Sequence, residues 1–173
     1  MAQQARSEAT RWKILTAAVD LFGDAGYTST GLGDVIERAG LTKGALYYHF
    51  DSKESLAEAI IAEAAARVWN AVDAINQGPI PGMEKVIHSS FVIAGIVTGD
   101  PLARTGVQLM RALGDFNERA TQTYTGMQLL ITELVEQAGA EGDLRAEVDP
   151  EVVGELLIAT YLGAELLSIA ALV

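Results

Sequence analysis

Apolar residues recur at helical spacing along almost the whole chain. In residues 8–25 they repeat at i, i+3 and i+4, which predicts an amphipathic helix with one buried face. The members of this stripe are Ile14, Leu15, Ala18, Leu21, Phe22 and Ala25. Gly26 follows at once, and a glycine in this place is typical of a left-handed helix stop.

Two short helices are predicted next. One apolar face at 31–39 consists of Leu32, Val35, Ile36 and Ala39. Thr30 is its expected N-cap and Gly40 its expected stop. Thr42 then has the residue type of an N-cap for a very short helix that runs to Phe50.

A long helix and four further helices complete the prediction. Asp51 and Glu54 have the spacing of a capping box, and the helix they open runs to about Asn76. The stretch NQGPIPG ends it, because glycine and proline interrupt helices. The later segments are expected at about 82–98, 102–113, 120–139 and 150–172. No run has strand spacing, so the sequence predicts an all-α fold with a small N-terminal helical unit and a larger C-terminal bundle.

Composition narrows the class of protein. The chain has 173 residues, half of them apolar and none of them cysteine, which excludes disulfides and thiolate metal sites and fits a cytoplasmic protein. Its first residues lack the apolar stretch of a signal peptide. The run from Val152 to Val173 is long enough to span a bilayer. Glu155 and Glu165 lie inside it, so a buried helix is favoured over a membrane span.

The negative charge is concentrated in one part of the chain. The net charge is −11. Residues 1–53 contain six basic and six acidic residues, whereas residues 54–173 contain six basic and seventeen acidic ones. The first third is therefore electrically neutral, and the acidic character of the whole chain says little about what this third binds.

Residues 31–50 have the layout of a helix-turn-helix, with two short helices joined by the tight turn Ala39-Gly40-Leu41. In such a unit the second helix enters the DNA major groove. Leu41, Leu46 and Phe50 can share its inward face. The side chains that then face away from the core belong to Lys43, Gly44, Tyr47 and Tyr48.

The outward residues have the chemistry of a DNA contact, although other uses remain open. Thr42 and Lys43 stand at a helix N-terminus, where free N–H groups favour phosphate, and Gly44 lets the backbone approach DNA. The alternative for the two tyrosines is core packing. His49 fits a phosphate contact and a surface or turn histidine equally, and Lys53 could be a solvated charge.

Three segments resemble the N-terminal domain of the TetR family of transcriptional regulators. They are TR-x2-IL-x-AA-x2-LF from Thr10, AGYTST from Ala25 and AGLTKGALYYHFDSKESL from Ala39. The resemblance covers about residues 8–68 and implies a DNA-binding domain there, with a ligand-binding and dimerisation domain at 69–173. It implies operator contacts at Thr30, Thr42, Lys43, Gly44, Ala45, Tyr47, Tyr48, His49 and Lys53. Ala45 would face the bases, with its methyl group near a thymine methyl.

The second part of the chain resembles one group within this family. The segments DPLARTGVQL, GDLRAEVDPE and LLIATYLGAELLS look like the γ-butyrolactone and furan autoregulator receptors of actinobacteria. These receptors tend to carry a tryptophan on the helix that corresponds to 120–139, where this chain has Met127 or Tyr124. The pocket candidates are Phe91, Met110, Met127, Leu130 and Thr160, with ordinary core packing as the alternative for each.

The resemblance implies a dimeric repressor that a small lipophilic effector, such as a γ-butyrolactone-like signal, releases from a pseudo-palindromic operator. A repressor of an efflux or catabolic operon, with a broad hydrophobic pocket, is the alternative. No catalytic residue, metal, cofactor or membrane partner is expected, since the chain has two histidines and no metal-ligand spacing. The apolar final helix predicts a dimer interface, or else the centre of a monomeric bundle. Because the sequence stops inside this run, a further dimerisation helix is expected beyond it.

Overall fold

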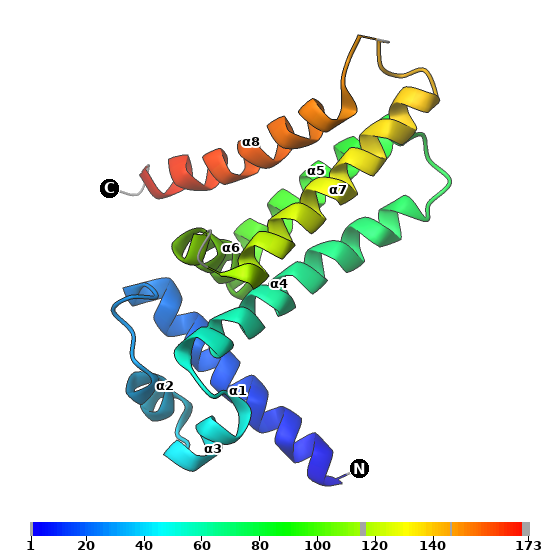
Figure 1. Cartoon of the computed structure of the whole chain (residues 1–173). Helices are drawn as coiled ribbons and strands as arrows, with labels where there is room; N and C mark the ends of the chain where they lie inside the picture. Colours follow the sequence, from blue (N-terminus) through cyan, green and yellow to red (C-terminus); the bar gives the residue numbers. More distant parts are fainter. Residues whose placement is uncertain (1, 115–116, 146, 171–173) are drawn as a thin grey trace. The chain divides into compact units, whose positions relative to one another are not determined.

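The computed structural model describes residues 2–114, 117–145 and 147–170, and for residues 2, 162 and 164–170 the backbone only (Figure 1). Within these ranges the chain forms eight helices and no strand, which confirms the all-α prediction. The helices are α1 (Ala2–Ala25), α2 (Leu32–Ala39), α3 (Lys43–His49), α4 (Lys53–Asn76), α5 (Gly82–Gly99), α6 (Pro101–Leu113), α7 (Glu118–Ala140) and α8 (Pro150–Ala170).

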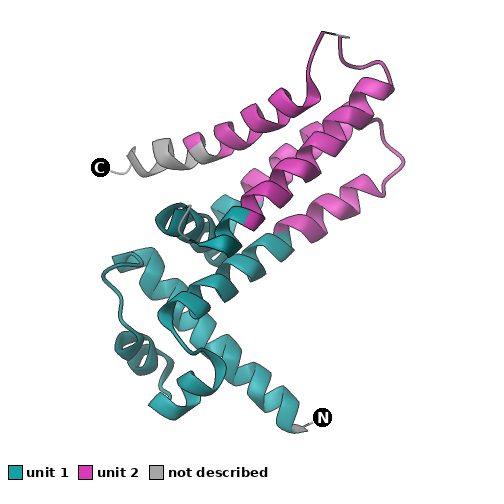
Figure 2. Cartoon of the chain, in the orientation of Figure 1, with its two compact units in different colours: residues 1–67, 96–121 teal, residues 68–95, 122–173 magenta. Residues whose placement is uncertain are grey.

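The chain divides into two compact units, shown in two colours in Figure 2. Unit 1 contains residues 1–67 and 96–121, and unit 2 contains residues 68–95 and 122–173. Unit 1 therefore holds α6 in addition to α1, α2, α3 and the first part of α4. The helix α6 comes from a part of the sequence that the resemblance assigns to the second domain.

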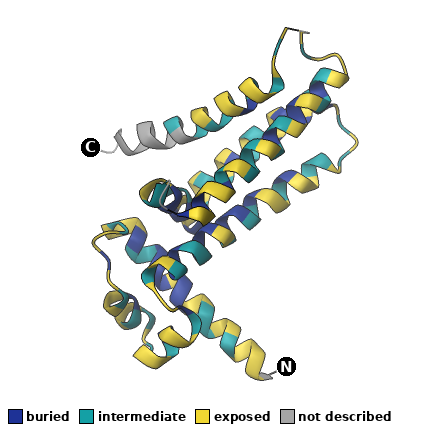
Figure 3. Cartoon of the chain, in the orientation of Figure 1, coloured by how far each residue is buried: buried dark blue, intermediate teal, exposed yellow. Residues whose placement is uncertain are grey.

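The core of unit 1 forms around the predicted apolar stripe of α1 (Figure 3). Ile14, Leu15 and Ala18 are fully buried, and Phe22 nearly so. The other elements contribute Val35 from α2, Leu46 from α3, and Leu56, Ile60 and Ile61 from α4, all completely buried. Ala25, the last member of the stripe, is exposed because α1 ends there.

Three of the predicted helix ends are confirmed. Gly26 has a φ of 83° and ends α1. Gly40 has a φ of 63°, and its N–H donates to the Glu37 carbonyl while the N–H of Leu41 donates to that of Ile36. The Thr42 hydroxyl accepts a hydrogen bond of 3.2 Å from the N–H of Ala45 and so caps α3.

Two predicted caps are wrong, and each is displaced by one residue. Gly31, not Thr30, is the N-cap of α2, and its N–H donates to the Asp34 carboxylate at 2.7 Å. At α4 the reciprocal bonds join Ser52 and Ser55, with N–H to hydroxyl distances of 3.1 and 3.0 Å, in place of the expected aspartate and glutamate. The pattern at each site offered neighbouring residues of equal capping quality, and only the path of the chain selects between them.

Helix α6 packs against both α1 and α4 inside unit 1. The Thr105 hydroxyl donates to the Val19 carbonyl of α1 at 3.4 Å. Asp100 caps α6 by accepting from the N–H of Leu102 at 2.9 Å, and it also pairs with Arg67 of α4. Gly106 faces Ala64 of α4 so closely that a Cβ at position 106 would lie 2.4 Å from the Ala64 Cβ. The absence of a side chain at Gly106 is thus what brings the two helices together.

Unit 2 also depends on glycines where helices approach. A Cβ at Gly82 would lie 2.5 Å from the Ala138 nitrogen of α7, and one at Gly154 would lie 2.6 Å from the Thr132 hydroxyl. The indole of Trp69 lies over Gly126 in the same way, at 3.0 Å from the position a Cβ would take. These contacts place α5, α8 and the second part of α4 against α7.

Among the helices of the described ranges, no single one is long and apolar enough to cross a bilayer. The consecutive helices α5 and α6 reach the required length and hydropathy only as a pair, and that pair is bent by 95°.

Glu141 holds the start of α5 and gives unit 2 a measurable pH dependence. Its carboxylate accepts from the Gly82 N–H at 2.6 Å and from the Gln137 amide at 2.7 Å, and these bonds lower its pKa below the ordinary value of 4.5. Because the pKa is lower in the folded state, this stabilisation is complete above the unfolded pKa and disappears as the pH falls through the folded one. We expect Glu141→Gln to lower the Tm at pH 7 and the difference from wild type to shrink as the pH falls below the ordinary pKa of 4.5. A difference that stays constant in a thermal-melt series from pH 7 to pH 3 would contradict this assignment.

Candidate DNA-binding surface

Helix α3 presents its polar side to solvent and its apolar side to the core of unit 1. Leu46 is completely buried and Phe50 is 4% exposed, as predicted for the inward face. Tyr47 is 42% exposed and Tyr48 is 78% exposed, so core packing is not the role of either tyrosine. Lys43 is exposed as well, and its ammonium lies 5.6 Å from the centroid of the Tyr47 ring.

We call the exposed residues of this helix and its cap, Thr42, Lys43, Gly44, Tyr47 and Tyr48, the α3 face. Between Thr42 and Phe50 the sequence contains a lysine and no acidic residue. A cation and two phenol groups make this face a set of hydrogen-bond donors suited to phosphate oxygens. A Cβ at Gly44 would meet no atom within 4 Å, so the helix backbone is open to approach at that position.

Ala45 and His49 lie at the margin of the α3 face, and both are half-buried. The His49 ring stands edge-on to Tyr48 with centroids 5.0 Å apart, and its centroid lies 6.4 Å from that of Phe50. The imidazole of His49 therefore packs near both the exposed Tyr48 ring and the buried Phe50 ring. Contacts of Ala45 and His49 with DNA remain predictions.

Thr30 and Lys53 hold the turn between α1 and α2. The Thr30 side chain is 3% exposed, and its hydroxyl lies 3.0 Å from the Gly26 carbonyl oxygen and 3.3 Å from that of Leu21. The Lys53 ammonium donates to the carbonyls of Tyr27 and Thr30 at 2.7 and 2.9 Å. A DNA contact at either position remains a prediction, and both side chains have a structural role without it.

Tyr27 also belongs to the turn between α1 and α2, and the sequence pattern did not identify it as a functional or structural residue. The Lys53 ammonium lies 4.2 Å from the centroid of the Tyr27 ring. The Tyr27 and Phe22 rings pack edge to face, with their centroids 5.4 Å apart. The ring is thus held between a cation and an aromatic residue. The segment AGYTST was visible in the sequence, but its lysine partner lies 26 residues away and only the fold brings it near.

Arg11 and Asn117 are two further residues that residue spacing did not reveal. Arg11 pairs with Glu63 of α4 at 3.0 Å and stands 5.7 Å from the centroid of the Phe50 ring. The buried amide of Asn117 donates to Glu54 and Glu58 at 3.0 and 2.9 Å, while its oxygen accepts from the N–H of Ala120 and caps α7. Both residues bond to the N-terminal half of α4, which follows directly after α3 in the chain.

The five pocket candidates have different environments. Met110 is buried in unit 1, whereas the other four belong to unit 2. Met127 and Leu130 are half-buried there. Phe91 is 76% exposed, and Thr160 is exposed with its hydroxyl donating to the Leu156 carbonyl at 2.7 Å. Within unit 2 neither of these last two side chains is enclosed, and a pocket formed by the five residues remains a prediction.

Two family descriptions match the chain. Residues 14–60 match "bacterial regulatory proteins, tetR family", which contains the helix-turn-helix and the α3 face. Residues 90–170 match "tetracyclin repressor-like, C-terminal domain". Together they cover both parts of the chain in the order that the sequence resemblance implies.

Two of the similar proteins are named as receptors. The A-factor receptor protein of Streptomyces griseus is 28% identical over 97% of this chain, which spans 58% of that receptor's length. A crystal structure of a γ-butyrolactone receptor, described as ArpA-like, is 29% identical, with a TM-score of 0.83 over 91% of this chain and 82% of that one.

A third similar protein is CprB, a TetR family protein of Streptomyces coelicolor A3(2). One structure of it is 31% identical, with a TM-score of 0.79 over 90% of this chain and 78% of CprB. A second structure, which contains its biological operator sequence, is 29% identical, with a TM-score of 0.77 over 90% of this chain and 77% of that one. This chain belongs to the TetR family of transcriptional regulators and is related to γ-butyrolactone receptors.

Proposed function

We propose that the chain is the protomer of a dimeric repressor that binds a pseudo-palindromic operator through the α3 face. The observation that carries this proposal is the exposure of Lys43, Tyr47 and Tyr48 on a helix whose opposite side is buried. In a two-fold dimer, two such helices enter successive major grooves about 34 Å apart. The operator complex of CprB supports the proposal by similarity.

A dimer is supported by the apolar residues that α8 leaves uncovered. Val152 is 49% exposed and Leu156 is 61% exposed, and they stand one helical turn apart. An exposed apolar stripe is typical of a surface that another protein chain covers, and most such assemblies are two-fold symmetric. Gly154, between them, faces α7 of the same chain, so the stripe lies beside an intramolecular contact.

We infer that the effector is a small lipophilic molecule of the γ-butyrolactone class, which binds the released state better than the DNA-bound one. This inference rests on similarity to proteins whose structures are named as γ-butyrolactone receptors. The second candidate is a repressor with a broad pocket for hydrophobic compounds. It is favoured by the absence of a tryptophan from α7 and by the adaptable side chain of Met127. A thermal-shift series of γ-butyrolactones and lipophilic cations separates the two, since a narrow receptor responds to the lactones only.

DNA binding is tested by fluorescence anisotropy with DNA from the gene's own promoter region, over a series of salt concentrations. We expect Lys43→Ala to weaken binding roughly tenfold for all DNA sequences and to reduce the salt slope by about one, as the loss of one phosphate contact requires. Gly44→Ala should leave folding intact, because the added methyl group meets open space, and should weaken DNA binding if the backbone approaches the groove.

The matched control is Arg145→Ala, which removes one positive charge from an exposed position of unit 2. It should leave both the affinity and the salt slope unchanged. The proposed surface is disproved if Lys43→Ala and Arg145→Ala bind DNA alike, or if wild-type binding does not depend on salt.

A further inference from the structure

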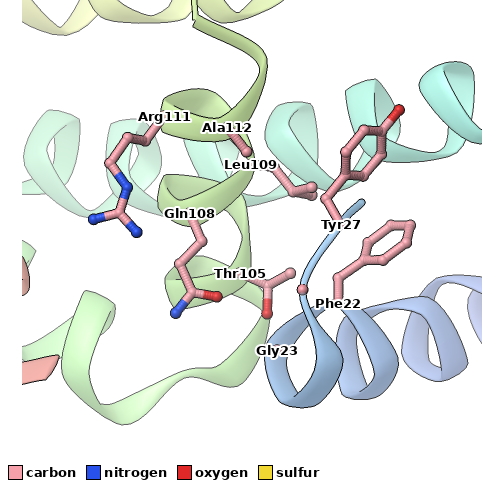
Figure 4. A pocket seen from close by; sticks show the side chains of 9 residues that line it. Phe22, Gly23, Tyr27, Thr105, Gln108, Leu109, Arg111 and Ala112 are labelled. Carbon is pink, nitrogen blue, oxygen red and sulfur yellow. The ribbon is translucent and has the colours of Figure 1, made fainter. Parts of the chain in front are cut away.

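A cavity of about 250 Å³ lies between the end of α1 and one face of α6, entirely within unit 1 (Figure 4). None of the candidates for the effector pocket lines it, although Met110 is the chain neighbour of Leu109 and Arg111, which do. Gly23, Arg111 and Ala112 are exposed, so the cavity reaches the surface of the unit. Its volume is below the range of about 300–1,000 Å³ that is usual for drug-sized ligands, which indicates a smaller molecule.

The two sides of the cavity differ in chemistry, as Figure 4 shows. The rings of Phe22 and Tyr27 stand together on one side, with Leu109 beside them. On the other side, α6 extends Gln108 and Arg111, which lie three residues apart and therefore on the same helix face. A molecule in this space would meet apolar and aromatic surface at one end and N–H donors at the other.

The donors on α6 are available to a ligand. Among the described residues neither Gln108 nor Arg111 has a hydrogen-bond or ion-pair partner, whereas Arg11, Arg38 and Arg67 each pair with a carboxylate. A guanidinium without a partner beside an amide is a natural receptor for a carboxylate, because both can donate to its two oxygens. Thr105, also in the wall, already donates its hydroxyl to Val19.

The groups around Tyr27 carry charges of both signs. Burial raises the pKa of the Tyr27 hydroxyl, and the nearby carboxylates of Glu54 and Glu58 raise it further. The Lys53 ammonium beside the Tyr27 ring offsets these two carboxylates, so the donors of Gln108 and Arg111 are what place the anionic group of the ligand. The apolar part of the ligand is left against the two rings.

We propose that this cavity is a binding site for a small organic anion, a monocyclic aromatic or aliphatic carboxylate, held at its charged end by Arg111 and Gln108. The site is distinct from the proposed effector pocket. Its occupant would touch Tyr27, whose carbonyl oxygen and ring are both held by Lys53 at the start of α4. If the proposed function holds, a ligand here would contact the turn that precedes α2 and α3.

Binding is tested on the whole chain without DNA, so that the result does not depend on the proposed function. Sodium benzoate is titrated into ¹⁵N-labelled protein, and the amide signals of Gly23, Gly26 and Thr105 are followed. We expect saturable shifts at these positions with a Kd on the order of 1 mM, as befits a ligand of this size. Benzamide, which has the same shape without the charge, should bind at least about fivefold more weakly.

Two variants locate the site. Arg111→Gln should weaken benzoate binding about tenfold, whereas Lys13→Gln, which removes an exposed charge of α1 outside the cavity, should have no effect. Gly23→Leu should abolish binding by filling the cavity. Its Cβ meets only the Thr105 hydroxyl, at an ordinary contact of 3.6 Å, so the variant should retain the wild-type Tm or exceed it.

The proposal is overturned if benzoate shifts none of the three amides, or if benzamide binds as tightly as benzoate. It is equally overturned if Arg111→Gln and Lys13→Gln bind benzoate alike, or if Gly23→Leu binds like wild type. Loss of operator binding in the anisotropy assay, by contrast, would refute the proposed function and leave this site standing.

Discussion

Replacing Gly106 with alanine is expected to destabilise the protein by about 1–3 kcal/mol. The new methyl carbon would lie 2.4 Å from the Ala64 Cβ, far inside van der Waals contact, and 3.6 Å from the Ile60 carbonyl oxygen. Both helices are fixed at this level, since α6 is bonded to α1 through Thr105 and paired with Arg67 of α4 through Asp100. The strain must therefore separate α4 from α6, which urea or thermal unfolding measures directly.

A second substitution should relieve this strain. Ala64→Gly removes the opposing methyl group, and by itself costs about 1 kcal/mol in helix propensity. In the Gly106→Ala background it should cost much less or stabilise the protein, with a coupling energy of about 1–2 kcal/mol in the double-mutant cycle. Gly33→Ala on α2, where an added Cβ meets nothing within 4 Å, is the control and should be neutral or stabilising. Purely additive effects at 64 and 106 would rule out the close packing of α4 on α6.

Replacing Lys53 with methionine should lower both stability and DNA affinity without changing the salt dependence of binding. The ammonium donates to the carbonyls of Tyr27 and Thr30 and lies over the Tyr27 ring, so its removal leaves these groups without their cation. Hydrogen bonds from a charged donor contribute about 1.5–3 kcal/mol, and partial exposure reduces this to about 1–2 kcal/mol here. The expected weakening of DNA binding follows from a loosened turn before α2, which involves no phosphate contact.

Lys43→Met is the variant with which Lys53→Met is compared, in both Tm and DNA affinity. The exposed Lys43 ammonium donates to no carbonyl among the residues that the structure describes, so this variant should keep the wild-type Tm. It should lose DNA affinity together with about one unit of salt slope. If Lys53→Met instead reduces the salt slope and leaves the Tm unchanged, Lys53 contacts phosphate directly and its bonds to the turn are secondary. The two lysines thus have separable effects that the residue types alone cannot distinguish.

Local sequence was a reliable guide wherever one segment decides its own structure. The stripe of α1, the glycine stops at Gly26 and Gly40 and the Thr42 cap are properties of a few consecutive residues. The inward and outward sides of α3 followed for the same reason, because Leu46 and Phe50 complete an apolar face and leave the tyrosines outside. The caps of α2 and α4 shifted by one residue because several adjacent polar residues could serve equally well.

The sequence by itself determined the helices of this protein, the polarity of the α3 face and, through a long ungapped resemblance, its family. Only the tertiary structure decided that α6 packs on α1 and α4, that Lys53 supports the turn at Tyr27 and that a cavity opens beside Arg111. The physical reason is the range of the interactions. Helical periodicity and capping act between residues at most four apart, whereas Val19 and Thr105, or Tyr27 and Lys53, become neighbours only when burial of the shared core brings distant segments together.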